Sequence, residues 1–532
     1  MRKSWLFWWL LLTVPVVILA QARDGSIERF IDIANAIFNS SVAGMNDILF
    51  FSIGGIPLIV IWLSVGAIFF TWRMNFVNFW AFEHALAIVW GRYDNPDEAG
   101  EVTHFQALST ALSATVGLGN IAGVAIAIQL GGPGAAFWMT VAGLFGMTSK
   151  FVECTLAQKY RVVRPDGSIL GGPMYYLSRG LSEMGLPGLG RGLGFSFAFL
   201  CVSSALGGGN MFQTHESYVA VSRIVPLQNW LYGFLMASLV GAVVIGGIRR
   251  IGRVTSTLVP LMAAIYTLAA LWVLIVHATA LPGAIATIIR EAFSPSAVIS
   301  GGAVGVFVQG IRRAVFSNEA GLGSAAIAHA AARTQEPIRE GLVGLLEPFI
   351  DTILICNMTA LAIVVTGAYR YDYADGQLAG VLMTSKAFGT VIPWFPVMLA
   401  AATFLFALST MISWSYYGEQ CWVYLLGTRS ALTYRILFVF CILLGSVRDD
   451  LTAIIDFSDM TFFVMAFPNL LGCFLMSGKV AADLQDYMMR LKSGTMEHRP
   501  WKLAKSQKYR PSSGSGEPSE PEEKRNPEGT RR

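Results

Sequence analysis

One glycine motif occurs twice in this chain, as VGLGN at residues 116–120 and as AGLGS at residues 320–324. Each copy lies within an apolar stretch long enough to cross a lipid bilayer. Paired glycines weaken a helix, and inside a membrane an unwound backbone is tolerated only where it lines a cavity. Interrupted apolar segments at corresponding places in two halves of a chain are typical of a transporter with a central binding site. Close helix packing is the alternative reason for such glycines.

The composition predicts a membrane protein. Of the 532 residues, 54% are hydrophobic and 14% are charged, whereas soluble domains carry about 25% charged residues. We therefore expect a multispanning protein whose main surroundings are the lipid bilayer. The net charge of +4 is small for this length and argues against a nucleic-acid partner. The chain lacks CxxC, GxSxG and HExxH motifs, so we expect no zinc site, no disulfide and no enzyme.

The two ends of the chain differ from its apolar middle. Residues 1–22 combine two basic residues, an apolar run and a small-x-small site, which indicates a cleavable signal peptide, with a retained extra helix as the alternative. Residues 23–52 would then form an extracytoplasmic segment. Residues 477–532 are expected to form a cytoplasmic disordered tail, because the chain beyond Pro500 is polar and lacks apolar periodicity.

Hydropathy predicts about eleven transmembrane helices in the mature chain, and hence an all-α polytopic membrane protein. One extra helix, residues 53–71, precedes two groups of five. The first group, residues 105–277, has spans at 105–128, 135–160, 195–221, 230–248 and 255–277. The second group, residues 300–476, has spans at 300–332, 341–367, 395–427, 431–447 and 452–476.

The loop charges predict the orientation. With the mature N-terminus outside, most loop lysines and arginines lie in the cytoplasm, as the positive-inside rule requires, and the C-terminus is also inside. Two successive groups of five helices then have opposite orientations. A second short echo, FVE at residues 151–153 and FID at residues 349–351, accompanies the glycine motifs. Together these features predict a five-plus-five inverted repeat.

Several longer blocks point to a known family. They are FQAL at 105–108, GLGNIAG at 117–123, GGPGAAFWM at 131–139, GGPMYY at 171–176, FSNEAGLGS at 316–324 and WSYYGE at 414–419. Over about residues 45–480 the chain resembles the alanine/glycine:cation (sodium:alanine) symporter family. This resemblance implies the LeuT fold of the amino acid–polyamine–cation superfamily and sodium-driven uptake of alanine or glycine by alternating access. A signal peptide with this topology suggests a bacterial inner membrane.

The substrate site is expected at the bilayer midplane, between the two breaks. Unwinding at Gly117 and Gly119 would free backbone N–H groups for the substrate carboxylate, and the second break would offer carbonyls to its ammonium group. The resemblance implies that Phe316 and Trp414 bound the substrate side chain. The predicted substrate-binding residues are Thr115, Gly117, Gly119, Asn210, Phe316, Glu319, Thr410 and Trp414.

A sodium site is expected beside the first break. Phe406, Ser409 and Thr410 have i, i+3, i+4 spacing and share one helix face, and sodium prefers such hydroxyl and carbonyl oxygens. With the carbonyls of Ser113 and Val116 they would offer five oxygens, which by resemblance form the conserved sodium site of the fold. The alternative is that the two hydroxyls bond to carbonyls of their own helix. No cofactor other than this coupling ion is expected.

Several ionisable residues leave alternatives open. An unpaired charge within a span costs roughly 2.5–3.5 kcal/mol, so Glu153 and Asp351 are expected to pair with a nearby lysine or arginine as braces or gates. His329 is expected near the membrane interface. A proton-coupled symporter of the same fold, using Glu319 or Glu153, is the alternative to sodium coupling. Asn120 is a candidate ligand for a second ion. The sequence gives no indication of an oligomeric state.

Overall fold

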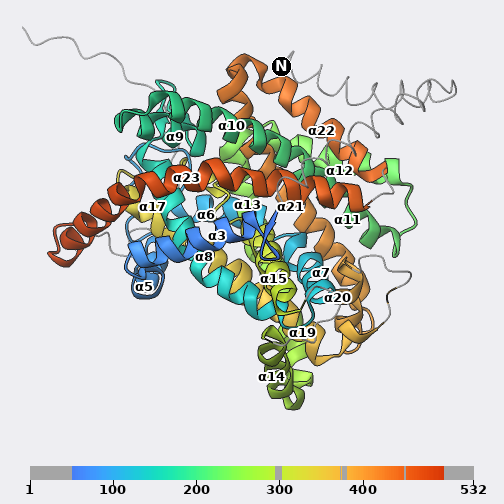
Figure 1. The fold of residues 1–532 in the computed structure, drawn as a ribbon. Coiled ribbons are helices and arrows are strands. Elements are labelled where there is room, and N and C mark those ends of the chain that lie inside the picture. The colour runs from blue at the N-terminus through green and yellow to red at the C-terminus, as the bar shows by residue number, and fades with distance from the viewer. Residues whose placement is uncertain (1–50, 294–301, 372, 374–379, 448–450, 497–532) are drawn as a thin grey trace, which may run out of the picture.

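The structure is a computed structural model that describes residues 51–293, 302–371, 373, 380–447 and 451–496. These residues are almost entirely helical (Figure 1). The exceptions are two small antiparallel hairpins, β1 (Ser52–Ile53) with β2 (Ile56–Pro57) and β3 (Val162–Val163) with β4 (Ile169–Leu170). The predicted signal peptide and nearly all of the predicted extracytoplasmic segment lie outside the described residues.

The helices follow the order that hydropathy predicts. The extra helix is α3 (Leu58–Arg73). The first group comprises α6 (His104–Thr115), α7 (Ala122–Gly131), α8 (Ala135–Lys159), α10 (Pro187–Leu206), α11 (Phe212–Ser222), α12 (Asn229–Val244) and α13 (Gly247–Val276). The second group comprises α15 (Ala303–Asn318), α16 (Ala325–His329), α17 (Pro337–Gly344), α18 (Leu346–Pro348), α19 (Asn357–Val365), α21 (Phe395–Leu426), α22 (Ala431–Val447) and α23 (Leu451–Lys492). Connecting helices are α4 (Val77–Trp80), α5 (Phe82–Val89), α9 (Pro173–Glu183), α14 (Leu281–Ala292) and α20 (Gly380–Gly389).

The described helices suit a multi-pass membrane protein. Seven helical segments are long and apolar enough to cross a membrane, and the bent pair α6–α7 makes an eighth. The apolar helices α3 and α12 are shorter, and α15 with α16 corresponds to the remaining predicted span. The long helix α23 crosses the molecule between α10 and α3 and packs against both (Figure 1). The total of eleven spans and their orientation stay predictions.

The first glycine motif interrupts its helix. α6 ends at Thr115, a single 3-10 turn η1 (Leu118–Asn120) follows, and α7 leaves at an angle of 55° to α6. The side chain of Asn120 stabilises the break, since its Oδ1 accepts a hydrogen bond from the backbone N–H of Gly117 at 2.8 Å. A side-chain oxygen thus replaces a helical carbonyl, as an interruption in an apolar interior requires.

The second motif interrupts its helix by a different route. Between α15 and α16 three residues have left-handed backbone angles: Glu319 at φ 55°, Gly321 at φ 90° and Gly323 at φ 85°. Glycine adopts such angles without steric cost. A Cβ on Gly323 would also lie 2.7 Å from Cγ of Pro173. Both breaks therefore lie where the sequence predicts them.

Several boundaries differ from those predicted, and two of them change the predicted division of the chain. α3 begins at Leu58 and not at residue 53, because the β1–β2 hairpin occupies the preceding residues. α23 continues to Lys492, past the predicted start of a disordered tail at residue 477. Val480, Leu484 and Tyr487 are buried there at i, i+4 and i+7, and Tyr487 Oη is 2.8 Å from Nε2 of His84. This apolar stripe keeps the helix packed beyond the predicted membrane edge.

Two π-helical segments were not predicted from the sequence. η2 (Gly207–Met211) lies between α10 and α11, and η4 (Phe349–Cys356) lies between α18 and α19. π-Helical turns are rare and are often found at functional sites. Both segments occur midway along their spans, and both hold residues of the central site described below.

We expect the Gly323→Ala variant to lose stability, because a left-handed backbone costs a non-glycine residue about 1–2 kcal/mol and the added methyl group would collide with Pro173. Thermal unfolding in detergent should show a lower Tm. The matched control is Gly192→Ala in α10, where a Cβ meets nothing within 4 Å and alanine should stabilise the helix by about 0.5–1 kcal/mol. Equal Tm shifts in the two variants would contradict this account.

Candidate functional site

A single buried carboxylate joins the two breaks. Asp351, in η4, accepts hydrogen bonds from Asn120 Nδ2 at 2.6 Å and from Ser317 Oγ at 2.9 Å. Asn120 belongs to the first break, and Ser317 lies in the last turn of α15, directly before the second. The backbones also come close, since a Cβ on Gly119 would lie 3.1 Å from Cα of Ser317. The predicted partner of Asp351 is therefore wrong: neutral donors bind it, and no lysine or arginine is needed.

A second carboxylate ties the second break to α21. Glu319 accepts a hydrogen bond from Trp414 Nε1 at 3.0 Å on one oxygen and from the Ser324 hydroxyl on the other. Glu319 and Trp414 are both buried. The sequence predicted both as site residues but not their contact. This bond fixes the indole ring in one orientation beside the break.

Unpartnered polar atoms face the first break. Thr410 Oγ1 is buried without a hydrogen-bond partner among the described residues, and a Cβ on Gly117 would lie only 2.6 Å from it. Gln213 Oε1 is also buried and unpartnered, 3.8 Å from the same Cβ position. Leaving a buried oxygen unpaired is costly, so such atoms mark a place for a ligand.

Gln213 was missed by the sequence analysis. It lies in α11 directly after η2, and its Nε2 donates to the carbonyl of Gly208 at 3.0 Å. The signal in the sequence that could have pointed to Gln213 is the glycine run at residues 207–209, directly before the predicted site residue Asn210. Asn210 itself is held differently, because its Nδ2 donates to the carbonyl of Phe438 in α22 at 2.7 Å.

Three of the predicted sodium ligands are in direct contact. Ser113 Oγ donates to the carbonyl of Ser409 at 2.7 Å, which joins α6 to α21. Ser409 Oγ donates to the carbonyl of Phe406 at 2.9 Å, so this hydroxyl also makes the bond to its own helix that the alternative predicted. Val116 is the residue at which α6 stops. Thr115, a predicted substrate residue, bonds back to the carbonyl of Ala111 at 3.3 Å.

Aromatic rings pack beside the breaks. Phe316 lies edge-on to Phe212, with ring centroids 5.4 Å apart, and 5.2 Å from Phe462. Trp414 lies 4.7 Å from the same Phe462 ring. Phe462, in α23, thus links the two predicted wall residues and was not identified from the sequence, since one phenylalanine among 34 carries no distinguishing signal.

The charged residues choose other partners than those predicted. Lys150 pairs with Glu347 at 3.0 Å, while Glu153 accepts a hydrogen bond from Asn469 Nδ2 at 2.7 Å. Arg312 and Arg313 both bind Asp459. His329 is fully buried within the protein, and its expected place near the membrane interface stays a prediction. Its ring faces the carboxylates of Glu340 and Glu347.

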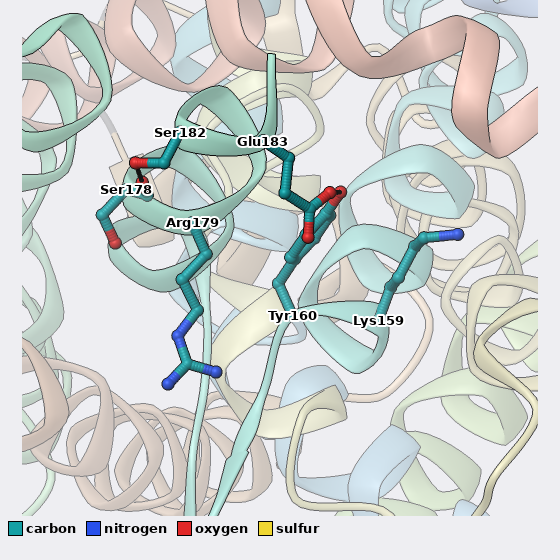
Figure 2. Close-up of a pocket in the computed structure, with 6 residues that line it drawn as sticks. All are labelled: Lys159, Tyr160, Ser178, Arg179, Ser182 and Glu183. Carbon is teal, nitrogen blue, oxygen red and sulfur yellow. Dashed lines mark hydrogen bonds between the residues drawn. The ribbon is translucent and has the colours of Figure 1, made fainter. Parts of the chain in front are cut away.

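A cavity of about 510 Å³ lies apart from these residues, where α8 ends beside α9 (Figure 2). Its lining residues are Lys159, Tyr160, Ser178, Arg179, Ser182 and Glu183. Glu183 accepts hydrogen bonds from Lys479 and Tyr160, which hold the pKa of this carboxyl below its usual range. None of the residues that form the two breaks lines this cavity, so it is not part of the central site.

Comparison with known proteins identifies relatives along most of the chain. A sequence model of the sodium:alanine symporter family matches residues 35–500. The sodium/alanine symporter AgcS of Methanococcus maripaludis is 40% identical, over 81% of this chain and 94% of the relative. The amino-acid carrier protein AlsT of Bacillus subtilis is 36% identical, over 84% and 94%. The probable sodium/glutamine symporter GlnT of Bacillus subtilis is 33% identical, over 82% and 89%. These relatives are transporters and not enzymes.

A solved structure gives the fold. The crystal structure of MhsT in complex with L-phenylalanine, a LeuT-fold protein, superposes with a TM-score of 0.51 over 71% of this chain and 89% of MhsT. The sequence identity is 15%, so this match establishes the fold alone. It agrees with the fold that the resemblance implied.

We expect Trp414→Phe to destabilise the protein by at least about 1–3 kcal/mol, because phenylalanine leaves one Glu319 oxygen unpaired and does not fill all the space of the buried indole ring. Thermal unfolding in detergent measures this loss. Tyr417→Phe, one turn along α21, is the matched control: its hydroxyl is buried without a partner among the described residues, so its removal should cost nothing. A Trp414→Phe protein as stable as the control would show that the indole–carboxylate bond carries no stability.

Proposed function

This chain belongs to the sodium:alanine symporter family, and from that premise we propose that it takes up alanine and glycine by symport with sodium. The family and the relatives support an amino acid:cation symporter of the LeuT fold. The observation that carries the finer proposal is the unpartnered Thr410 hydroxyl on α21, which faces Gly117 in the first break. What distinguishes Thr410 from other buried hydroxyls without a partner among the described residues, such as those of Thr403 and Tyr417, is its place against the interrupted backbone at Gly117.

We place the substrate carboxylate at the first break. The N-terminal end of α7 directs a positive helix dipole toward this point. Thr410 supplies a hydroxyl donor beside Gly117, two residues before Gly119. Gln213 presents its Oε1 acceptor there, which suits the ammonium group or the sodium ion and not the carboxylate. The ammonium group then lies toward the second break, where Glu319 contributes negative charge. Asn210 belongs to the π segment η2 that precedes Gln213, and its buried Oδ1 has no hydrogen-bond partner among the described residues.

The proposed sodium ion binds next to the carboxylate. Ser113, Val116, Phe406, Ser409 and Thr410 offer only hydroxyl and carbonyl oxygens, which suit a hard cation and require no acid to titrate. The contact between Ser113 and the Ser409 carbonyl supports this placement, because it brings the end of α6 against α21. Ion and carboxylate would share Thr410, so binding of either one favours binding of the other.

The walls of the site favour small substrates. Phe316 and Trp414 are packed against Phe462, and a Cβ on Gly209 would lie 2.4 Å from Cγ of Trp414. A side chain longer than a methyl group would have to displace these packed rings, which costs typically 1–3 kcal/mol or more. This argument supports alanine and glycine over larger amino acids.

An ion pair of Arg313 closes the path to the site on one side of the two breaks. The Arg313 guanidinium binds Asp459 of α23 and lies 5.2 Å from the centroid of the Phe316 ring. We propose a bacterial inner-membrane protein with its cleaved N-terminus outside and its C-terminus in the cytoplasm. In this orientation the Arg313–Asp459 pair faces the outside. Breaking it would free α15 from α23 and open a path to Phe316.

The direct test is uptake of radiolabelled alanine into proteoliposomes, with an inward sodium gradient or with potassium replacing sodium. We expect accumulation only with sodium, and competition by unlabelled glycine but not by glutamine or phenylalanine. Equal uptake in both salts that collapses with a proton gradient would overturn sodium coupling. Competition by glutamine equal to that by glycine would overturn the proposed substrate preference.

In the same assay, Thr410→Val should raise the sodium concentration for half-maximal uptake by about tenfold, because loss of one oxygen ligand costs on the order of 1–2 kcal/mol. Thr403→Val is the matched control, since Thr403 is also a buried, unpartnered threonine on α21 but lies two turns before Thr410. It should leave the sodium dependence unchanged. The same shift in both variants would remove Thr410 from the proposed ion site.

A further inference from the structure

Five buried ionisable side chains are linked one to the next around α16, the helix that follows the second break; we call this group the His329 chain. Lys150 Nζ lies 3.0 Å from Glu347 Oε2, and Glu347 Oε1 lies 2.6 Å from His329 Nε2. His329 Nδ1 lies 2.6 Å from Glu340 Oε1, and the other oxygen of Glu340 contacts His104 Nδ1. Each of these side chains is at most 1% exposed. The His329 chain connects α8, α18, α16, α17 and the first turn of α6.

The geometry at His329 requires an additional proton. A neutral imidazole has one N–H donor and one lone pair, whereas both ring nitrogens of His329 face carboxylate oxygens at 2.6 Å. With a neutral ring and two ionised carboxylates, one lone pair would face another. An imidazolium donates to Glu340 and to Glu347 at once and satisfies both contacts.

Charge balance leads to the same conclusion. Glu340 and Glu347 carry two negative charges, and Lys150 supplies one positive charge. His104 can donate Nδ1–H to Glu340 as a neutral ring, because its Nε2 has no hydrogen-bond partner among the described residues. One proton on His329 therefore makes this buried chain neutral, and without it a net negative charge is left in an apolar interior.

Other ionisable groups modify this balance without replacing the proton. The sulfur of Cys154 lies within 4.8 Å of a ring nitrogen of His329 and of a carboxylate oxygen of Glu347. Asp94 Oδ1 lies 3.9 Å from His104 Nε2, and the Asp94 side chain is 36% exposed. Other described groups that interact electrostatically with these five side chains or with Asp94 include Glu153, Arg161, Glu319, Arg333, Arg339, Asp351 and Tyr417.

A metal ion fits this position less well than a proton. Cys154, His329 and Glu347 would offer three ligand atoms. However, the ammonium group of Lys150 already binds Glu347, and the second nitrogen of His329 is bound to Glu340. A cation of charge two would have to displace one of these pairs and bear repulsion from the other positive charge.

We propose that His329 is a binding site for one proton, held as an imidazolium between Glu340 and Glu347, and that this proton keeps α16 packed against α17 and α18. Its loss puts a lone pair against a carboxylate oxygen, so α16 must move away from one of its neighbours. Since α16 begins directly after the second break, this movement disturbs the central site and transport slows. His104, whose Nε2 lies 3.9 Å from the partly exposed Asp94, is the member of this group nearest to solvent, at the end of the molecule where α6 begins.

Histidine-selective ¹⁵N NMR of the whole protein tests the proton directly, and with six histidines in the chain the spectrum is simple. Because both ring nitrogens of His329 face carboxylates, we expect one ring with both nitrogens protonated at about pH 7, where a histidine with the ordinary pKa of about 6.5 is mostly neutral. This signal should vanish in His329→Gln and persist in the control His277→Gln, whose histidine binds a carbonyl in its own helix. If His329→Gln does not fold, Glu340→Gln assigns the signal by shifting its titration to lower pH. A neutral His329 ring throughout about pH 6–9 would overturn the proposal.

The transport consequence rests on the proposed function and is measured separately. Sodium-driven alanine uptake is followed with the same pH on both faces, so that no proton gradient contributes. Wild-type uptake should fall by up to about tenfold per pH unit above the titration of His329, whereas His329→Gln should give a reduced and flat profile. A variant that keeps the wild-type pH profile would refute the role in transport. Absence of any alanine uptake would refute the proposed function, while the NMR result still decides the proton site.

Discussion

The structure depends on one constraint: an interrupted helix in an apolar interior must find partners for its polar groups. Two such interruptions lie beside each other, and they share one solution, the Asp351 carboxylate bound by Asn120 and Ser317. Because a buried carboxylate accepting several hydrogen bonds is held rigidly, the two breaks form one unit and not two loose turns. Glu319 extends this unit to α21 through the Trp414 indole.

Among the buried polar atoms that lack a partner within the described residues, the oxygens of Thr410 and Gln213 are distinguished by their position, because both lie beside Gly117 in the first break. These atoms lie where Gly117 leaves no room for a side chain, so a ligand entering there meets polar groups that the fold has left free. The rigid carboxylate network holds the backbone around this point while the ligand comes and goes.

Charged groups lie on both sides of the central unit. Arg313 with Asp459 joins α15 to α23 before the second break, and the His329 chain joins α16 to α17, α18, α8 and α6 after it. Buried ion pairs contribute little net stability but are costly to leave half-made, so each cluster tends to be either fully formed or fully open. That property would suit the alternating access that the proposed function requires.

The sequence by itself determined the membrane location, the order of the helices and both breaks. These follow from hydropathy and from glycine motifs, which act over a few neighbouring residues. Only the tertiary structure decided which polar groups meet: Asp351 binds amide and hydroxyl donors and not a lysine or arginine, His329 lies buried between two carboxylates, and Gln213 reaches the first break from a π segment. Which partner a buried polar side chain binds depends on how helices far apart in the sequence cross each other. The chemistry of the residue alone would allow several partners equally well. The α23 extension to Lys492 has the same origin, since contacts with α5 and its neighbours stabilise a helix that hydropathy ends earlier.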